Sequence, residues 1–368
     1  MVGKTLRYGL LIGVIAALIV SVGASAQTKG SGSAKLTHLD VGLALIPPKM
    51  TFVGFYVAQD MGFFKQQGLD VNLEGFDGGV KSLRGVASGS VDMGATSADD
   101  VIAAATQGGG VKAIWSYAMP LDTTLVVDKS INSLSDLAGK NLGITDPGGF
   151  ADVQMRAVLN IAHVKVTDAN IISLPNRAAL LPAIVSGRIN AFPAHADDGY
   201  AAEAQDPNLK ALYPIYKALP LWWYGSLAVK SSYIASHKDV IEKFITAMDL
   251  ADRWIYTHRA GTIAIGVKYT QEPQDVVTKA YDFLAKAHEW TVNTGLQPVR
   301  VITTMEHEFQ YKEIPSLPTY NEVANRNYAN AVVAKIGAYP PANTAACTAH
   351  PKGKQCAKDQ KKASKGWF

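Results

Sequence analysis

The stretch Leu39–Ser97 limits most strongly what this chain can fold into, because it alternates short apolar runs with amphipathic segments. A first apolar run ends at Pro47-Pro48, an amphipathic segment follows, and a second strand-like run begins at Leu69. The spacing predicts a β-α-β unit, continued by a helix after Gly78-Gly79 and by a short strand that ends near Thr96-Ser97. Each predicted strand therefore ends in a loop that begins a helix, which is where open α/β sheets bind ligands.

A second series of the same kind follows. Strands are expected at 141–145, 171–174 and 189–192, with helical periodicity between them, and 236–336 is mostly helical in pattern. The sequence thus predicts an α/β fold of two lobes. Each lobe is a mostly parallel sheet flanked by helices, and two crossings, near residues 120 and 225, join the lobes.

The length of 368 residues favours two domains. The predicted division is a signal peptide at 1–26, a flexible tether at 27–35, a discontinuous first lobe at 36–120 and 225–336, a second lobe at 121–224, and a basic, disordered tail at 337–368.

The N-terminus has the pattern of a secretory signal. Lys4 and Arg7 precede an apolar run of about 14 residues, and Ala24-Ser25-Ala26 provides a small-residue cleavage site after Ala26. A membrane anchor is the alternative, but this run is shorter than the roughly 20 residues needed to span a bilayer. We therefore expect an exported, periplasmic protein.

Charge and cysteine content exclude several classes of protein. The formal net charge is +4, but the tail beyond Cys347 is strongly basic, which leaves the body of the exported chain near −3 and without a footprint for nucleic acid. Cys347 and Cys356 are the only cysteines in the sequence. With eight residues between them they can close at most one small loop, and they make a poor zinc site. Hydrolase elbows, zinc-protease motifs and phosphate loops are absent from the sequence, so we expect no enzyme, no metal and no cofactor.

A family resemblance becomes visible in three blocks of sequence. The run from Phe55 to Val71, the segment Gly89–Gly94, and the block Ser133–Ile144 resemble the periplasmic solute-binding proteins of ABC importers, and most of all the branch for nitrate, sulfonates, taurine and thiamine-pyrimidine precursors. The resemblance covers roughly Leu36 to Lys335. It implies two lobes that close on a solute by hinge motion.

Three helix starts offer backbone amides and small residues to a solute: Gly78-Gly79, Thr96-Ser97 and Gly148-Gly149. Ordinary helix capping is the alternative for each. The resemblance points to corresponding loops and implies roles for Pro48, Phe52, Gly79, Ser97, Gly148, Gly149 and Phe150. Sulfonate-binding relatives often have Gly, Ser and Thr where this chain has Asp146-Pro-Gly-Gly-Phe, which argues against a small inorganic anion.

Aromatic and polar candidates lie at the second crossing and after a predicted strand. In a strand, Trp222 and Trp223 point to opposite faces, so one is expected to reach the cleft while the other packs; core packing of both is the alternative. His195 and Asp197 begin a predicted loop and are candidate hydrogen-bonding partners of the solute, although a plain surface loop explains them too. Arg177 is either a partner for a carboxylate or a solvated side chain.

These features together predict an extracytoplasmic, monomeric binding protein. It captures a small organic solute, anionic or aromatic, and delivers it to an inner-membrane ABC permease with its ATPase. Two alternatives remain: a ligand-sensing receptor domain, and an enzyme related to thiamine-pyrimidine synthases, whose cysteine-rich motif this chain lacks. The identity of the solute is not predicted.

Overall fold

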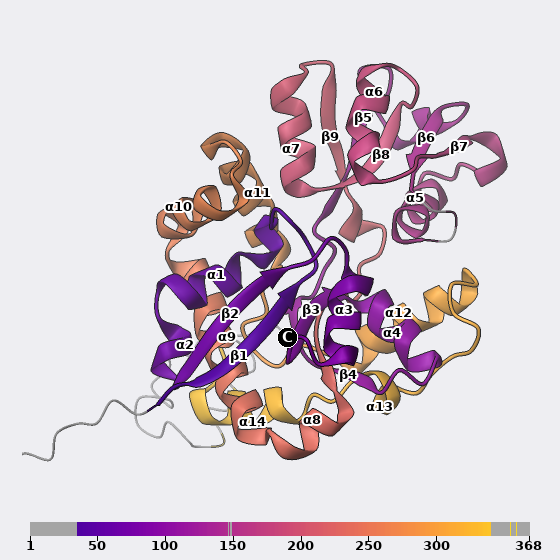
Figure 1. Cartoon of the computed structure of the whole chain (residues 1–368). Helices are drawn as coiled ribbons and strands as arrows, with labels where there is room; N and C mark the ends of the chain where they lie inside the picture. The colour runs from indigo at the N-terminus through magenta and orange to yellow at the C-terminus, as the bar shows by residue number, and fades with distance from the viewer. Residues whose placement is uncertain (1–34, 146, 148, 340–353, 355–357, 359–368) are drawn as a thin grey trace, which may run out of the picture. The chain divides into compact units, whose positions relative to one another are not determined.

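The computed structural model describes residues 35–145, 147, 149–339, 354 and 358 (Figure 1). The chain divides into two units, Met1–Lys35 and Leu36–Phe368, and the fold below is that of the second unit. The predicted signal peptide with its cleavage point, Gly148 and both cysteines lie outside the described residues, as do most of the tether and of the basic tail. In the described part of the chain, no helix has both the length and the apolar character required to cross a bilayer.

The first sheet has five strands in the order β2-β1-β3-β10-β4. Its strands are β1 (Thr37–Leu43), β2 (Leu69–Gly75), β3 (Met93–Ser97), β4 (Val111–Ala118) and β10 (Gly225–Lys230). β1 pairs in parallel with β2 and β3, whereas β10 runs antiparallel to β3 and β4. This sheet is therefore complete only after the chain has built the second sheet and returned.

The second sheet repeats that arrangement with the order β7-β6-β8-β5-β9. Its strands are β5 (Thr123–Asp128), β6 (Asn141–Ile144), β7 (Asn170–Ser173), β8 (Ala191–His195) and β9 (Leu209–Pro214). β6 is parallel to β7 and β8, and β5 is antiparallel to β8 and β9. The predicted fold class, two mostly parallel sheets flanked by helices and joined by two crossings, is confirmed. We call the elements around the first sheet the first lobe and those around the second sheet the second lobe.

Helices cover both sheets. Those of the first lobe are α1 (Val53–Asp60), α2 (Phe63–Gln66), α3 (Gly79–Ser88), α4 (Ala98–Thr106), α8 (Ser231–Ser236), α9 (Lys238–Thr257), α10 (Arg259–Thr270), α11 (Gln274–Ala287), α12 (Pro298–Gln310), α13 (Tyr320–Val323) and α14 (Asn327–Ile336). Those of the second lobe are α5 (Phe150–Ile161), α6 (Leu180–Val185) and α7 (Ala196–Gln205). Short 3-10 turns are η1 (Met50–Phe52), η2 (Leu134–Leu137), η3 (Val166–Asp168), η4 (Arg177–Ala179) and η5 (Ile215–Lys217).

The long helix α9 shows why the first lobe holds together. Its buried residues recur every three or four positions, and the ring of Phe244 lies 5.2 Å from Phe64 of α2 and 6.5 Å from Phe55 of α1. Burying one such side chain stabilises the fold by about 1.5–3 kcal/mol. α1 approaches closely because Gly54 has no side chain: a Cβ there would lie 2.4 Å from Oδ1 of Asp252.

Two crossings join the lobes, and these crossings lie side by side. The first runs from the end of β4 at Ala118 to the start of β5, and the second from the end of β9 to the start of β10. The backbone N–H of Tyr224 in the second crossing donates to the carbonyl of Met119 in the first, at 3.2 Å. The carbonyl of Tyr224 in turn accepts from the N–H of Ala98, at 2.6 Å, at the start of α4.

The expectation that Trp222 and Trp223 lie in a strand is wrong, because β10 begins only at Gly225. Both indoles are buried, with exposed fractions of 2% and 0%. Trp223 donates its backbone N–H to Oγ1 of Thr304 at 2.8 Å and its Nε1–H to the carbonyl of Gly225 at 3.1 Å. These hydrogen bonds replace the strand ladder that was predicted for Trp222 and Trp223.

Replacing Trp223 tests the packing of the second crossing. In a Trp223→Phe variant we expect the free energy of unfolding to fall by about 1–3 kcal/mol, because the buried carbonyl of Gly225 keeps only the hydroxyl of Ser116 as a side-chain donor and a void remains. Chemical denaturation measures this change. Val185, whose side chain is 58% exposed, is the control: Val185→Ala should change stability by less than about 0.5 kcal/mol. A Trp223→Phe protein as stable as the parent would contradict this role.

Candidate binding cleft

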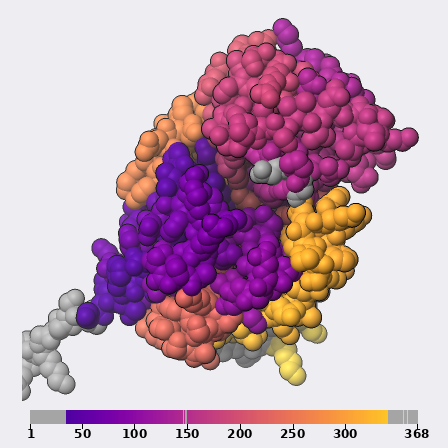
Figure 2. Space-filling view, turned by 45° about the vertical axis from the view of Figure 1, so that its right-hand side comes forward, coloured from indigo at the N-terminus to yellow at the C-terminus, as the bar shows by residue number. Residues whose placement is uncertain are grey.

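A cavity of about 750 Å³ opens between the lobes, and Figure 2 shows the surface hollowed where the second lobe, in magenta, meets the first. A cavity of this size suits a small organic molecule. The first lobe lines it with Leu45, Ile46, Pro47, Lys49, Asp77, Gly78 and Glu272. Side chains of the second lobe at its wall include Asn176, Arg177, Leu180, Leu181, Phe192 and Asp198. The lining thus combines apolar surface with charged groups from both lobes.

The first predicted loop, at Pro48, lies at the wall of this cavity, but its aromatic residue, Phe52, does not line the cavity. Pro48 is half-buried between Pro47 and Lys49, which both line the cavity. Phe52 is only 1% exposed, and its ring packs against that of Tyr117 at 5.0 Å. Phe52 therefore belongs to the core beneath the loop.

The second and third predicted loops meet each other. Gly78 begins α3 with a φ of 109°, a conformation that favours glycine. A Cβ on Gly79 would lie 1.9 Å from Oδ2 of Asp100 and 2.2 Å from Oγ1 of Thr96, so only glycine fits there. The hydroxyls of Thr96 and Ser97 both donate to Asp100, the latter at 2.8 Å. The hydroxyls of Thr96 and Ser97, which we predicted to donate to a solute, are thus bound to the carboxylate of Asp100.

In the second lobe, α5 begins at the predicted glycine loop. Gly149 is its N-cap, and Phe150 is its first residue. The ring of Phe150 stacks on that of Tyr224, with centroids 5.7 Å apart and planes 11° from parallel. An aromatic surface therefore joins the second lobe to the second crossing at this point.

The prediction of a loop at His195 and Asp197 is wrong. His195 ends β8 and Asp197 lies in the first turn of α7, and both are buried, with exposed fractions of 7% and 1%. Nδ1 of His195 lies 2.6 Å from Oδ2 of Asp122 in the first crossing. Oδ2 of Asp197 accepts from the backbone N–H of Met50 at 2.7 Å. Both side chains contact residues outside the sheet of the second lobe, and neither faces solvent.

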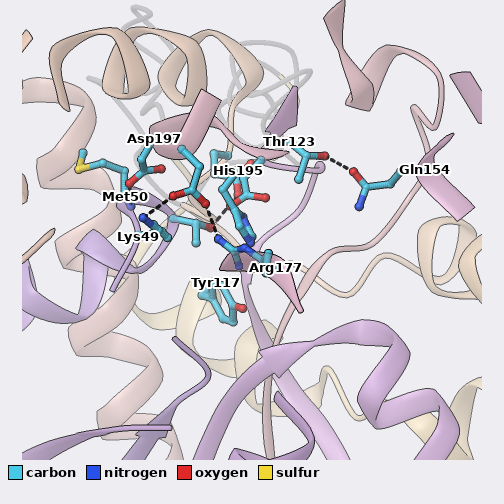
Figure 3. A network of polar contacts seen from close by, with 12 residues as sticks. Lys49, Met50, Tyr117, Thr123, Gln154, Arg177, His195 and Asp197 are labelled. Carbon is cyan, nitrogen blue, oxygen red and sulfur yellow. Dashed lines mark hydrogen bonds and ion pairs between the residues drawn. The ribbon is translucent and has the colours of Figure 1, made fainter. Parts of the chain in front are cut away.

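Five residues form a polar contact between the lobes, which we call the interlobe bridge: Lys49, Met50, Arg177, Asp197 and Asp198. Figure 3 labels Lys49, Met50, Arg177 and Asp197 of this bridge. Nζ of Lys49, in the first lobe, lies 2.6 Å from Oδ1 of Asp198, in the second. Arg177 pairs with the other oxygen of the same carboxylate. Burial raises the pKa of Asp198, but Arg177 and Lys49 outweigh it and bring that pKa down to about 2. Asp198 is therefore ionised between the two cations.

Helix α7 extends this contact along the first lobe. The ring of Tyr200 lies 6.3 Å from that of Phe283 in α11, and Tyr216 lies 5.8 Å from the same ring. Nζ of Lys279 is 3.5 Å from Oε2 of Glu203. One edge of the cleft is thus closed by direct contact between the lobes.

Four carboxylates from α4, α12 and the turn after α12 form what we call the acidic wall: Asp99, Asp100, Glu308 and Glu313. Burial raises the pKa of Asp99 to about 7, and Asp100 adds to the shift. Burial also raises the pKa of Glu313 to about 8, with Asp99 and Asp152 adding to it and Arg156 opposing it. Because Arg156 and Asp152 belong to α5, the wall faces the second lobe.

Sequence reasoning missed several of these residues. Lys49 and Asp198 each stand directly beside a predicted residue, but they pair with each other across 149 positions of sequence, and Asp99-Asp100 begins two positions after the predicted Ser97. Trp222 has a buried Nε1 with no partner among the described residues, and its ring lies 6.1 Å from that of His307. Across the part of the chain that the structure describes, no three His, Cys, Asp or Glu side chains have the geometry of a metal site.

The family model described as NMT1/THI5 like matches residues 49–260, which is more than half of the chain. This chain belongs to the NMT1/THI5-like family. The match includes both crossings and most of the cleft residues, and the resemblance predicted from the sequence, to periplasmic solute-binding proteins of ABC importers of the nitrate and sulfonate branch, is confirmed.

Individual relatives of this NMT1/THI5-like protein are distant. A Bacillus subtilis (strain 168) protein named "Putative binding protein YtlA" is 23% identical over 309 residues, which cover 81% of this chain and 91% of the relative. The periplasmic aliphatic sulphonate binding protein SsuA from Escherichia coli matches with a TM-score of 0.64 at 17% identity, over 77% of this chain and 91% of that one. The periplasmic nitrate-binding protein NrtA from Synechocystis PCC 6803 has a TM-score of 0.64 at 11% identity, over 82% and 90%. At these identities the structural likeness establishes the fold.

The raised carboxylate pKa values predict an unusual dependence of stability on pH. Because the folded NMT1/THI5-like chain binds these protons more tightly than the unfolded chain, their contribution to stability is complete below about pH 4 and is lost as pH rises through about 6 for Asp197, 7 for Asp99 and 8 for Glu313. We expect the free energy of unfolding of the solute-free protein to fall by at least about 2 kcal/mol between pH 5 and pH 8, because these groups lose protons over this range in the folded chain and are already ionised in the unfolded chain.

Chemical denaturation at four pH values between 5 and 8 tests this. A Glu313→Gln variant should lose part of the slope above pH 7. Asp239→Asn, which changes a carboxylate that is 78% exposed on α9, should leave the slope as it is. Stability that increases from pH 5 to pH 8 would show that these groups do not titrate as described.

Proposed function

We propose that this chain is the extracytoplasmic solute-binding protein of an ABC import system. It captures a small organic solute between its two lobes and delivers it to an inner-membrane permease driven by an ATPase. The lobes, at 36–120 with 225–336 and at 121–224, act as the two moving bodies. The chain is exported, loses its signal peptide after Ala26, and works in the periplasm as a monomer.

The observation that carries this proposal is the cavity between the lobes together with the interlobe bridge beside it. Lys49 of the first lobe and Arg177 of the second share one carboxylate, that of Asp198, at the cavity wall. Such a contact forms only when the lobes approach each other, and two crossings that lie side by side permit such an approach. Membership in the NMT1/THI5-like family and relatives named as binding proteins support capture of a solute over catalysis.

The organic character of the solute follows from the lining. Leu45, Leu180, Leu181 and Phe192 present apolar surface in the cavity, and the Phe150–Tyr224 stack adds an aromatic surface near the crossing. We propose that Pro48, Gly78 and Gly149 position the loops around the solute. The anionic end predicted from the sequence depended on free donors at three helix starts, and the hydroxyls at one of them, Thr96-Ser97, are engaged by the carboxylate of Asp100.

The solute itself identifies this function most directly. Native mass spectrometry of protein purified from its own host should show a bound small molecule that is lost on denaturation. The same molecule, added at 100 times its dissociation constant, should stabilise the protein by about 2.7 kcal/mol in a thermal-shift assay. A receptor domain would bind a solute in the same way, but its gene would stand without those of a permease and an ATPase.

Weakening the interlobe bridge should open the cleft. In an Asp198→Asn variant, Lys49 and Arg177 lose the charge that they share, so we expect a larger radius of gyration in small-angle scattering of the solute-free protein than in the parent. Asp282→Asn is the matched control, because it removes an exposed pair with Arg259 inside the first lobe. Identical scattering curves for the Asp198→Asn variant and the parent would contradict a role of this bridge in closure.

A further inference from the structure

We propose that the cavity between the lobes selects an uncharged solute, with an apolar body and a neutral polar group such as a carboxamide. This inference rests on the proposed function of solute capture and names the substrate class. One property of the cavity lining carries it. Among the lining residues that the structure describes, each charged side chain already has an ionic partner within the chain.

Four of the charged lining residues form one network of ion pairs across the cavity wall, which we call the charged network: Arg177, Asp198, Lys49 and Glu272. Arg177 pairs with Asp198 inside the second lobe. From the first lobe, Nζ of Lys49 lies 2.6 Å from Oδ1 of Asp198 and 3.5 Å from Oε1 of Glu272. Two cations thus face two carboxylates, and the network as a whole carries no net charge.

The remaining charged residue of the lining is Asp77, and it is paired as well. Its Oδ2 lies 2.8 Å from Nζ of Lys81 in α3. The side chain of Asp77 is also 92% exposed, so water solvates its charge in the absence of a solute. The described lining therefore offers a solute neither a surplus cation nor a surplus carboxylate.

The charged network cannot exchange its partners without a cost. The side chain of Lys49 is only 9% exposed. Burial lowers the pKa of Lys49, but Asp198, Asp197 and Glu272 outweigh burial and raise that pKa, so the ammonium group stays protonated. Removing one partner from such a network leaves a charge that is poorly solvated and unpaired, which is strongly unfavourable.

An anionic solute would compete with the protein for its cations. To bind both Lys49 and Arg177, it would have to displace Asp198, whose pair with Lys49 joins the two lobes. Capture of an anion would thus weaken the contact that closes the cleft. The backbone N–H of Gly78, which also lines the cavity, donates to the carbonyl of Ala44 at 3.0 Å and is not free for an anion.

A cationic solute meets the converse difficulty. Asp198 already receives two cations, and Glu272 faces Lys49. A further positive charge placed beside these carboxylates would lie close to Lys49 and be repelled by it. A solute of either sign would therefore lose the energy of its own hydration without finding an unpaired counter-charge.

The rest of the lining suits an uncharged molecule. Apolar side chains from both lobes contribute to it, among them Leu45, Ile46, Leu181 and Phe192. Ile46 is 64% exposed although it belongs to the lining. A solute with an apolar body would cover surface of this kind, and the removal of apolar surface from water favours binding.

Two neutral amide side chains complete the lining and suit a neutral polar group. Oδ1 of Asn176 accepts from the backbone N–H of Ala179 at 3.1 Å, and the Nδ2 amide of Asn176 remains as a donor toward the cavity. Gln205, at the end of α7, is exposed and offers both a donor and an acceptor. A carboxamide on the solute can hydrogen-bond with both side chains without a change in charge.

The test uses the full exported chain and probes that share one shape and differ in charge. Benzamide is uncharged, benzoate is anionic and benzamidine is cationic; hexanamide and hexanoate repeat the comparison with an aliphatic body. Each probe is titrated at neutral pH by calorimetry and by thermal shift. We expect benzamide and hexanamide to bind about tenfold or more tightly than their charged counterparts, because the charged probes find no unpaired partner.

Variants of the charged network should change this selectivity in opposite directions. Glu272→Gln leaves Lys49 and Arg177 with one carboxylate, so the affinity for benzoate relative to benzamide should rise by about tenfold. Lys49→Met leaves Glu272 without its partner, so the affinity for benzamidine relative to benzamide should rise by a similar factor. Asp239→Asn removes an exposed carboxylate on α9 and should leave both ratios unchanged. The melting temperature of each empty variant shows whether it folds, and either network variant supplies the test if the other does not.

Several results overturn the inference. In the parent, tighter binding of benzoate or benzamidine than of benzamide contradicts it, and failure of both benzamide and hexanamide to bind rejects the uncharged class. Ratios that stay unchanged in the folded network variants show that the charged network does not set selectivity. A charged molecule found by native mass spectrometry overturns the uncharged class but supports solute capture, whereas the absence of any bound molecule counts against the proposed function itself.

Discussion

Two backbone hydrogen bonds at Tyr224 tie the interlobe crossings to each other and to the first lobe. One joins Tyr224 to Met119 in the neighbouring crossing, and the other joins it to Ala98 at the start of α4. There is no room for a side chain at Gly225, where a Cβ would lie 2.5 Å from the ring of Tyr117. The crossings therefore stay side by side, and each delivers an antiparallel strand, β5 or β10, that completes a sheet. Both lobes and the cleft between them depend on this junction.

Charge is distributed unevenly around the junction. Asp122, Asp197 and Glu289 are each at most 1% exposed, and each has one carboxylate oxygen without a partner in the described part of the chain. Glu289 does accept from the hydroxyl of Thr51 at 2.9 Å, and burial, with Asp122 adding to it, raises its pKa well above the usual range. Such a concentration of acid costs stability when the cleft is empty.

Local periodicity predicted much of the fold. The strands beginning at Leu69 and Asn141 start where the sequence placed them, because their apolar pattern is consistent with their burial. The run Trp222–Tyr224 failed because it alternates like a strand while its backbone amides donate to Thr304 and Met119. Helix α7 was missed because its small and polar residues carry little apolar periodicity.

The candidate site was less predictable than the fold. The partners of His195 and Asp197 lie 73 and 147 residues away in sequence, at Asp122 and Met50. The acidic wall likewise joins Asp99 to Glu308, and the near-neutral body of the chain gives no sign of it. Sequence reasoning located the loops before α3, α4 and α5 correctly, but it was wrong to place a loop at His195 and Asp197. The sequence did not indicate which groups in these loops form hydrogen bonds or ion pairs within the chain, because several of their partners are distant in sequence.

The distance between the lobes tests solute capture most directly. With Cys347 and Cys356 changed to serine, Val80→Cys in α3 and Val185→Cys in α6 offer exposed positions for spin labels, one on each lobe. Pulsed electron–electron double resonance then measures the distance between the two spin labels, with and without the solute that was identified in the protein purified from its host. Closure on a guest predicts a shift of the distribution to shorter distances at saturating solute. An unchanged distribution, with a solute that raises the melting temperature, would contradict it.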